Sequence, residues 1–252
     1  MVRSFYLILA TAIGLVIPVP SHSRNFPRIV HGDVSYPAPV GVWGSHEYTI
    51  IDAILRTGSV DAYPRLTSEA TRPVFLKMID AGNVAAVHDR SVPLLRRLID
   101  LRSYDGYIGC IRARYNIHTR LGAPLQAELV LLQAFLLDLS ALTVEMTEPF
   151  LVSLESNERQ QLQQMNFFDT FATLKNHVAG VVTSLSETTV YSTAQRRELT
   201  EAIGRTFPAM RGLFTTLERE QTAAELLRLA RSTGDPNLRR ALTATARIVA
   251  VD

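Results

Sequence analysis

The stretch LQAELVLLQAFLLDLSALTVE, residues 125–145, decides the fold class. Fourteen of its first twenty residues are apolar, and Pro124 precedes it as a helix-opening residue. A helix that is apolar around most of its circumference is typical of the centre of a bundle. Its polar residues Gln126, Gln133 and Ser140 recur every seven residues, which predicts one thin solvated stripe.

Two charged residues distinguish this helix from a membrane span. Glu128 and Asp138 interrupt the apolar run, whereas a span needs about 20 nearly uncharged residues. Pro149 is expected to bend or end the helix. The stretch therefore predicts a core helix surrounded by other helices.

The next long helix is predicted over residues 158–186, with Asn157 as its cap. Its apolar residues alternate steps of four and three along the chain: Phe167, Phe171, Leu174, Val178, Val181 and Leu185. That spacing is the seam of left-handed helix packing. We expect this helix to pair antiparallel with the central helix across a short loop.

The C-terminal third shows clear helix boundaries. Ser192 followed by Gln195 predicts a capping box, with Leu199 and Ile203 facing inward in the helix that it starts. Pro208 is expected to interrupt that helix, and a short helix is predicted over 223–229. Asp235 followed by proline predicts the start of a last helix over 237–249.

The rest of the mature chain divides at about residue 47. Residues 24–47 are broken by glycines and prolines, which predicts an extended strap; a β-hairpin could form only there. Residues 48–252 are expected to form an all-α domain, an antiparallel bundle around the central helix. The alternative is a short solenoid, because residues 234–242 are similar to the turn and second helix of a HEAT-type repeat. No fixed repeat period supports the solenoid.

The N-terminus has the layout of a secretory signal over residues 1–23. Arg3 precedes an apolar run of residues 5–17, then prolines, then Ser21 and Ser23 as small residues at the cleavage site. The apolar run is short for a span of about 30 Å of hydrocarbon, so a retained anchor is the second interpretation. The chain is therefore expected to be exported, to the periplasm or outside the cell.

Charge and cysteine content exclude several functions. The chain has 26 bases and 24 acids; loss of residues 1–23 removes one base, leaving 25 against 24. This balance gives no electrostatic reason to expect nucleic acid as a partner. Cys110 is the single cysteine, so no intramolecular disulfide is possible. Its apolar surroundings favour a small buried side chain over a nucleophile.

No metal or cofactor site is predicted. The acid pairs Glu145 with Glu148, and Glu128 with Asp138, lack the glutamate–x–x–histidine steps of di-metal bundles. His88 and the aspartate after it resemble the metal ligands of HD-type phosphohydrolases, and His46 and Asp138 would have to complete that set. The context expected around such a pair is missing.

Glu128 and Asp138 each have an ordinary structural explanation. Glu128 lies in the first turn of the central helix, where the helix dipole stabilises a carboxylate. Asp138 lies in mid-helix, where a buried charge without a partner would be costly. An arginine or Lys175 is the expected partner for Asp138.

Two functions from different classes remain. The first is a non-catalytic binding or scaffold protein of the cell envelope, holding an apolar ligand or contacting another envelope protein. The second is a secreted hydrolase whose site is built on loops. A pocket lined by Asp138, Glu128 or His88 would favour the hydrolase, and a filled core would favour the binding protein. A third, weaker interpretation is that the central helix inserts into a membrane after unfolding.

Overall fold

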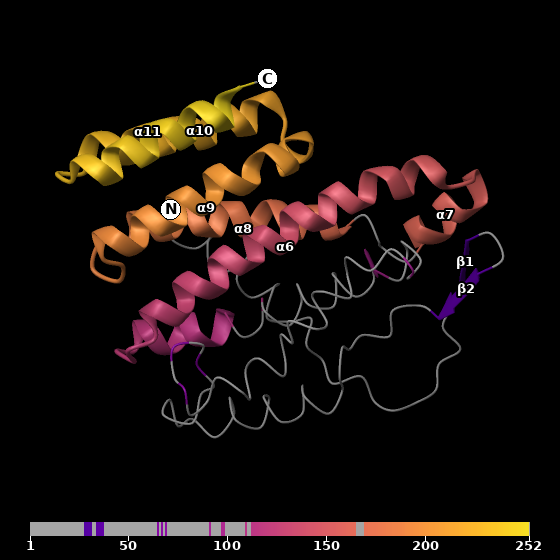
Figure 1. Ribbon diagram of the computed structural model, residues 1–252, viewed down its shortest axis with the longest axis horizontal. Helices are drawn as coiled ribbons and strands as arrows, with labels where there is room; N and C mark the ends of the chain where they lie inside the picture. Colours follow the sequence, from indigo (N-terminus) through magenta and orange to yellow (C-terminus); the bar gives the residue numbers. More distant parts are fainter. Residues whose placement is uncertain are drawn as a thin grey trace, which may run out of the picture.

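Two ranges of the chain carry most of the described structure. The computed structural model describes residues 28–31, 34–37, 112–164 and 169–251, together with residues 65, 67, 69, 91, 97, 98 and 109. From residue 112 onward the described chain is helical almost throughout (Figure 1). The all-α class is confirmed. The predicted signal segment and most of residues 48–111 lie outside the described residues.

The helices follow one another with short connections. They are α6 (Gln126–Ser153), α7 (Ser156–Gln164), α8 (Asp169–Ser186), α9 (Thr193–Met210), the 3-10 turn η2 (Arg211–Leu213), α10 (Thr216–Ser232) and α11 (Pro236–Ala250). Residues 112–120 form a further helix before α6. The turn after that helix contains Gly122, whose φ of 97° is a left-handed conformation that glycine adopts without strain.

Two short strands lie in the N-terminal segment. β1 (Arg28–His31) pairs antiparallel with β2 (Val34–Pro37), with Arg28 opposite Pro37 and His31 opposite Val34. The pair lies beside α7 (Figure 1). It falls within residues 24–47, where a hairpin was the only expected β-structure.

The C-terminal helices run in two opposite directions. α6, α9 and α11 run in the same direction, with α9 between the other two, and α8 and α10 run the opposite way (Figure 1). The main partner of α6 among the described helices is therefore the parallel α9, although α8 also contacts it. The predicted antiparallel pairing with α6 is present in α8, which contacts α6 and runs in the opposite direction. α7 lies between the two along the chain in place of the expected short loop.

The long apolar run is the core helix that the sequence predicts. Leu129, Leu132, Leu136 and Leu137 of α6 are fully buried. Length and composition alone would let α6 cross a membrane, but 56% of its apolar window is buried inside the protein. A core helix of a water-soluble protein has these same properties.

Both helix-interior prolines were expected to break helices, and neither does. α6 continues through Pro149 to Ser153, and α9 continues through Pro208 to Met210. The neighbouring Phe150 and Phe207 are fully buried. Packing of these rings holds the turns that lack one backbone hydrogen bond.

The predicted helix starts agree closely with the structure at two of three sites. Ser192 and Gln195 form a reciprocal capping box, and Asp235 accepts a 2.7 Å hydrogen bond from the Leu238 N–H. The short helix predicted over 223–229 is longer in the structure, where it forms part of α10. Thr215 and Glu218 form its capping box, a signal that was missed.

The predicted helix over residues 158–186 is two helices in the structure. α7 begins at Ser156, so Asn157 lies inside it, and Glu158 accepts a hydrogen bond from the Glu155 N–H at 2.8 Å. Four residues of the predicted seam, all in α8, are buried: Leu174, Val178, Val181 and Leu185. The seam is therefore confirmed over α8, while Phe167 lies outside the described residues.

The stripe of polar residues on α6 is not solvated. Gln133 and Ser140 are buried. The Gln133 Nε2 donates to the Tyr191 hydroxyl at 3.0 Å, and the Ser140 hydroxyl donates to the Leu136 carbonyl at 2.7 Å. Partners inside the protein replace water, so polar side chains do not mark the exposed face of this helix.

A close approach between α9 and α11 depends on Gly204. A Cβ added there would lie 3.0 Å from the Thr245 Oγ1 and 3.6 Å from the Ile248 Cδ1. We expect Gly204→Leu to lower the free energy of unfolding by about 1–3 kcal/mol, because the new side chain forces the helices apart. Urea denaturation measures the change. Gly212→Leu is the control, since nothing lies within 4 Å of a Cβ at that position; equal losses in both variants would contradict the expectation.

Candidate binding surface on α11

Asp138, a candidate for a buried charge, lies at the surface. Its side chain is 49% exposed and pairs with Arg205 of α9, whose Nη2 lies 3.0 and 3.1 Å from the two carboxylate oxygens. The predicted arginine partner is confirmed. Because α6 is apolar around most of its circumference, its sequence did not show that the edge carrying Asp138 faces solvent.

Glu128 is buried, as its position on the apolar side of α6 suggested. Its Oε1 accepts the Thr67 backbone N–H at 2.9 Å and also the Thr67 hydroxyl. The first-turn position adds the helix dipole to these two donors. Hydrogen bonding thus accounts for this carboxylate without a ligand.

His177 is a buried histidine that the sequence did not single out. Its Nδ1 lies 3.1 Å from the Ser140 Oγ. Because the Ser140 hydroxyl donates its one proton to Leu136, Nδ1 carries the ring proton and donates to Ser140. Burial, and to a lesser extent the charge of nearby Arg112, lower the pKa of His177 to about 3. The imidazole is therefore neutral at ordinary pH.

The remaining sequence candidates form no described site. Glu145 and Glu148 are exposed near the end of α6. Within the described ranges, no three histidine, cysteine or acidic residues are placed to hold a metal ion. His46, His88 and Cys110 lie outside the described residues, and so does the aspartate after His88.

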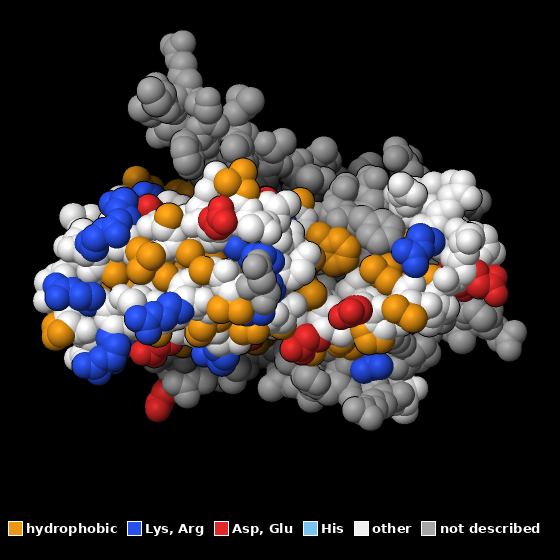
Figure 2. All heavy atoms as spheres, turned by 90° about the horizontal axis from the view of Figure 1, so that it is seen from above, with side chains coloured by type: hydrophobic (Ala, Val, Ile, Leu, Met, Phe, Trp, Pro, Cys, Tyr) orange, Lys and Arg blue, Asp and Glu red, His pale blue; other side chains and the backbone are white. Residues whose placement is uncertain are grey.

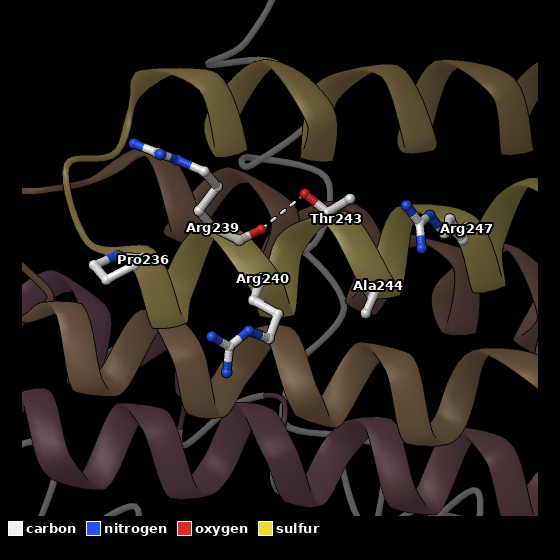
Figure 3. A pocket seen from close by; sticks show the side chains of 6 residues that line it. All are labelled: Pro236, Arg239, Arg240, Thr243, Ala244 and Arg247. Carbon is white, nitrogen blue, oxygen red and sulfur yellow. Dashed lines mark hydrogen bonds between the residues drawn. The ribbon is translucent and has the colours of Figure 1, made fainter.

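The solvent face of α11 carries an open basic hollow of about 330 Å³. It is lined by Pro236, Arg239, Arg240, Thr243, Ala244 and Arg247. Figure 3 shows the side chains of Arg239 and Arg240 pointing to opposite sides of the helix, with Thr243 on the side of Arg239 and Ala244 on the side of Arg240. The Thr243 hydroxyl donates to the Arg239 carbonyl at 2.8 Å. We call these six residues the α11 groove.

Several cations of the described helices outside the α11 groove are paired with acids. These pairs are Arg120 with Glu187, Lys175 with Glu218, Arg197 with Glu201, Arg205 with Asp138 and Arg228 with Glu225. Hydrogen bonds from Lys175 lower the pKa of Glu218, and those from Arg228 lower the pKa of Glu225. These pairs leave little net charge on their own surfaces.

The α11 groove, in contrast, has no acid on its own helix. The sequence of α11 contains three arginines and no aspartate or glutamate. Arg239 donates to the Thr233 carbonyl at the end of α10, and no ion pair joins Arg240 or Arg247 to a described acid. In Figure 2, which looks down on α10 and α11, several arginine or lysine side chains gather over this end of the molecule. The groove is therefore a positively charged surface.

A second hollow of about 420 Å³ lies where four helix ends meet. Its lining includes Arg196, Arg228, Thr193, Thr233 and Asp235. Arg228 is neutralised by Glu225, and Asp235 is used as the cap of α11. This hollow therefore has no strong preference for a charged ligand.

The chain stands apart from the proteins compared with it. No protein-family model, curated protein or solved structure matches it. The interpretation of the α11 groove therefore rests on its own chemistry.

The α11 groove was not predicted from the sequence. Arg239 contacts a helix end. The signal that points to the groove is the absence of acids over residues 236–250, combined with arginines seven residues apart at 240 and 247. That spacing places both arginines on one helix face.

Proposed function

We propose that this chain is an exported, non-catalytic binding or scaffold protein of the cell envelope. It contacts another envelope protein through the α11 groove. The observation that carries the proposal is the set of three arginines on the solvent face of α11, where the helix itself supplies no acid. Arginine binds carboxylates with two parallel hydrogen bonds, and it is enriched at protein interfaces.

The contacts of the other candidate residues support binding over hydrolysis. Asp138 pairs with Arg205, and Glu128 accepts from Thr67. Neither residue lines the α11 groove or the second hollow. A hydrolase that used Asp138 or Glu128 would need that carboxylate in a pocket, next to other groups that take part in proton transfer.

The shape and charge of the groove favour a protein partner over an apolar small molecule. The groove is open, and guanidinium groups dominate its lining. Apolar ligands are held in enclosed cavities lined by apolar side chains. An acidic protein surface can instead contact Arg240 and Arg247 together.

Photo-crosslinking in the source cells tests the contact. A photo-reactive amino acid replaces Ala244, which lies in the groove, or Ala194, an exposed alanine at the start of α9. We expect a crosslinked product of defined mass from position 244, and none of that mass from position 194. Mass spectrometry identifies the crosslinked protein. Identical products from both positions, or no product from position 244, would reject the proposal.

Export has its own readout. The full chain with a C-terminal tag is expressed in the source cells, and the tagged product is purified from the envelope and culture fractions. We expect a mature protein that begins at Arg24, because residues 1–23 have the layout of a cleaved signal. A product that keeps Met1 and stays in the cytoplasmic fraction would reject export.

A further inference from the structure

The end of α6 exposes a surface that complements the α11 groove. Glu145 and Glu148 are both exposed, and Val152 is 82% exposed, which is unusual for a large apolar side chain. These three residues are spaced by three and four along the helix, so they lie on one face. No ion pair links either glutamate to a described base. We call Glu145, Glu148 and Val152 the α6 tip.

The acids along α6 differ in their partners. Asp138, seven residues before Glu145, is paired with Arg205 of α9. Figure 1 shows the last turns of α6 continuing past the end of α9. No such ion pair with a described base neutralises the two glutamates of the α6 tip.

The two surfaces are opposite in charge. The α6 tip carries Glu145 and Glu148, three residues apart on one helix, and the α11 groove carries Arg240 and Arg247, seven residues apart on another. Val251, which follows α11, is 53% exposed beyond Arg247. Each surface thus combines charged groups of one sign with a single exposed valine.

We infer that the α11 groove of one molecule binds the α6 tip of a second copy of this chain. The inference rests on the proposed function, since it names the partner of the same groove. The contact joins two different surfaces of the chain, one on α6 and one on α11. Two molecules that each contribute both surfaces form a closed dimer, whereas molecules that contact two different neighbours form a ring or a filament.

Charge and shape favour a second copy over a lipid surface. Near an anionic bilayer, each of the three arginines would contribute only about 1 kcal/mol to the free energy of membrane binding. Membrane-bound helices also insert large apolar side chains, whereas Thr243 and Ala244 lie between the arginines of the groove. The small Ala244 side chain instead lets a second helix approach closely.

A charge-swap experiment tests the contact with the full mature chain. The first variant carries Arg240→Glu and Arg247→Glu, and the second carries Glu145→Arg and Glu148→Arg. Sedimentation velocity measures association over a concentration series at low and high salt. Arg114→Glu is the matched control, because Arg114 is exposed on the helix at 112–120.

The wild-type protein is expected to associate, and more weakly at high salt. Each double variant alone should associate at least about tenfold more weakly than the wild-type protein. An equimolar mixture of the two variants should associate again, because one molecule presents an acidic groove and the other a basic tip. The control should behave as the wild type does.

Two outcomes would overturn the self-association. One is a wild-type protein that stays monomeric throughout the series, and the other is a mixture that associates no better than its components. Neither outcome removes the groove as a binding surface, because the crosslink from position 244 can still contain a different envelope protein. Binding of the wild type, but not of the Arg240→Glu and Arg247→Glu variant, to phosphatidylglycerol vesicles without self-association would assign the groove to lipid and also overturn the inference.

Discussion

Replacing Phe207 by alanine should lower the free energy of unfolding by about 3–5 kcal/mol, because the cavity in the core is large. The Phe207 ring is fully buried in α9, and its centroid lies 5.0 Å from that of Phe214. α9 lies between α6 and α11, so a cavity at this ring weakens the packing of α9 against its neighbours. Urea denaturation followed by circular dichroism measures the loss.

Leu217→Ala is the control for the Phe207 variant. Leu217 lies in the neighbouring α10 but is 63% exposed, so its truncation should change stability by no more than about 0.5 kcal/mol. A Phe207→Ala variant that loses less than about 1 kcal/mol would mean that this part of the core is not packed as the structure has it.

Unfolding should become easier as the pH falls below about 6.5, the ordinary pKa of histidine. Burial holds the pKa of folded His177 at about 3, against 6.5 in the unfolded chain. Between these values the unfolded chain binds a proton that the folded protein does not. The contribution of His177 to stability is therefore constant above about pH 6.5, and it declines towards pH 3 by at most roughly 1.4 kcal/mol per pH unit.

The His177→Gln variant isolates this contribution. Urea denaturation of both proteins between pH 5 and 7.5 should give a steeper decline for the wild type, because glutamine does not titrate. The depressed carboxyl pKa values of Glu218 and Glu225 act at lower pH and are common to both proteins. Parallel pH profiles would show that His177 accepts a proton in the folded state.

The helix boundaries were predictable because capping is local. Ser192 with Gln195, and Asp235 with Pro236, satisfy the first N–H groups of α9 and α11 within four residues of chain. The seam of α8 was predictable for a similar reason, since its period is set by the geometry of one helix. Such signals need no knowledge of the rest of the fold.

The exposed edge of α6 was not predictable from α6 alone. Gln133 is paired with Tyr191, which lies 58 residues away, and Ser140 with His177, which lies 37 residues away. A uniformly apolar helix has no clear polar face, so its orientation depends on which neighbours supply hydrogen bonds. The sequence therefore assigned Gln133 to solvent, and that assignment was wrong.

The candidate site was recognisable only after the charges were paired in space. Arginines are common in this sequence, and neighbouring acids neutralise many of them: Arg205 is paired with Asp138 across 67 residues of chain. No ion pair joins Arg240 or Arg247 to a described acid, and both lie on a helix that has no acid of its own. Glu145 and Glu148 of the α6 tip are likewise not joined to a described base.

Hydrogen–deuterium exchange of the mature protein in water, without detergent or lipid, tests the central claim most directly. That claim is that α6 is the core helix of a water-soluble helical protein that presents α11 to its partner. Amides of the buried stretch from Leu129 to Leu139 should be among the slowest to exchange, together with those of α9. Rapid exchange of this stretch in water, with protection appearing only when vesicles are added, would make α6 a membrane segment and contradict the account.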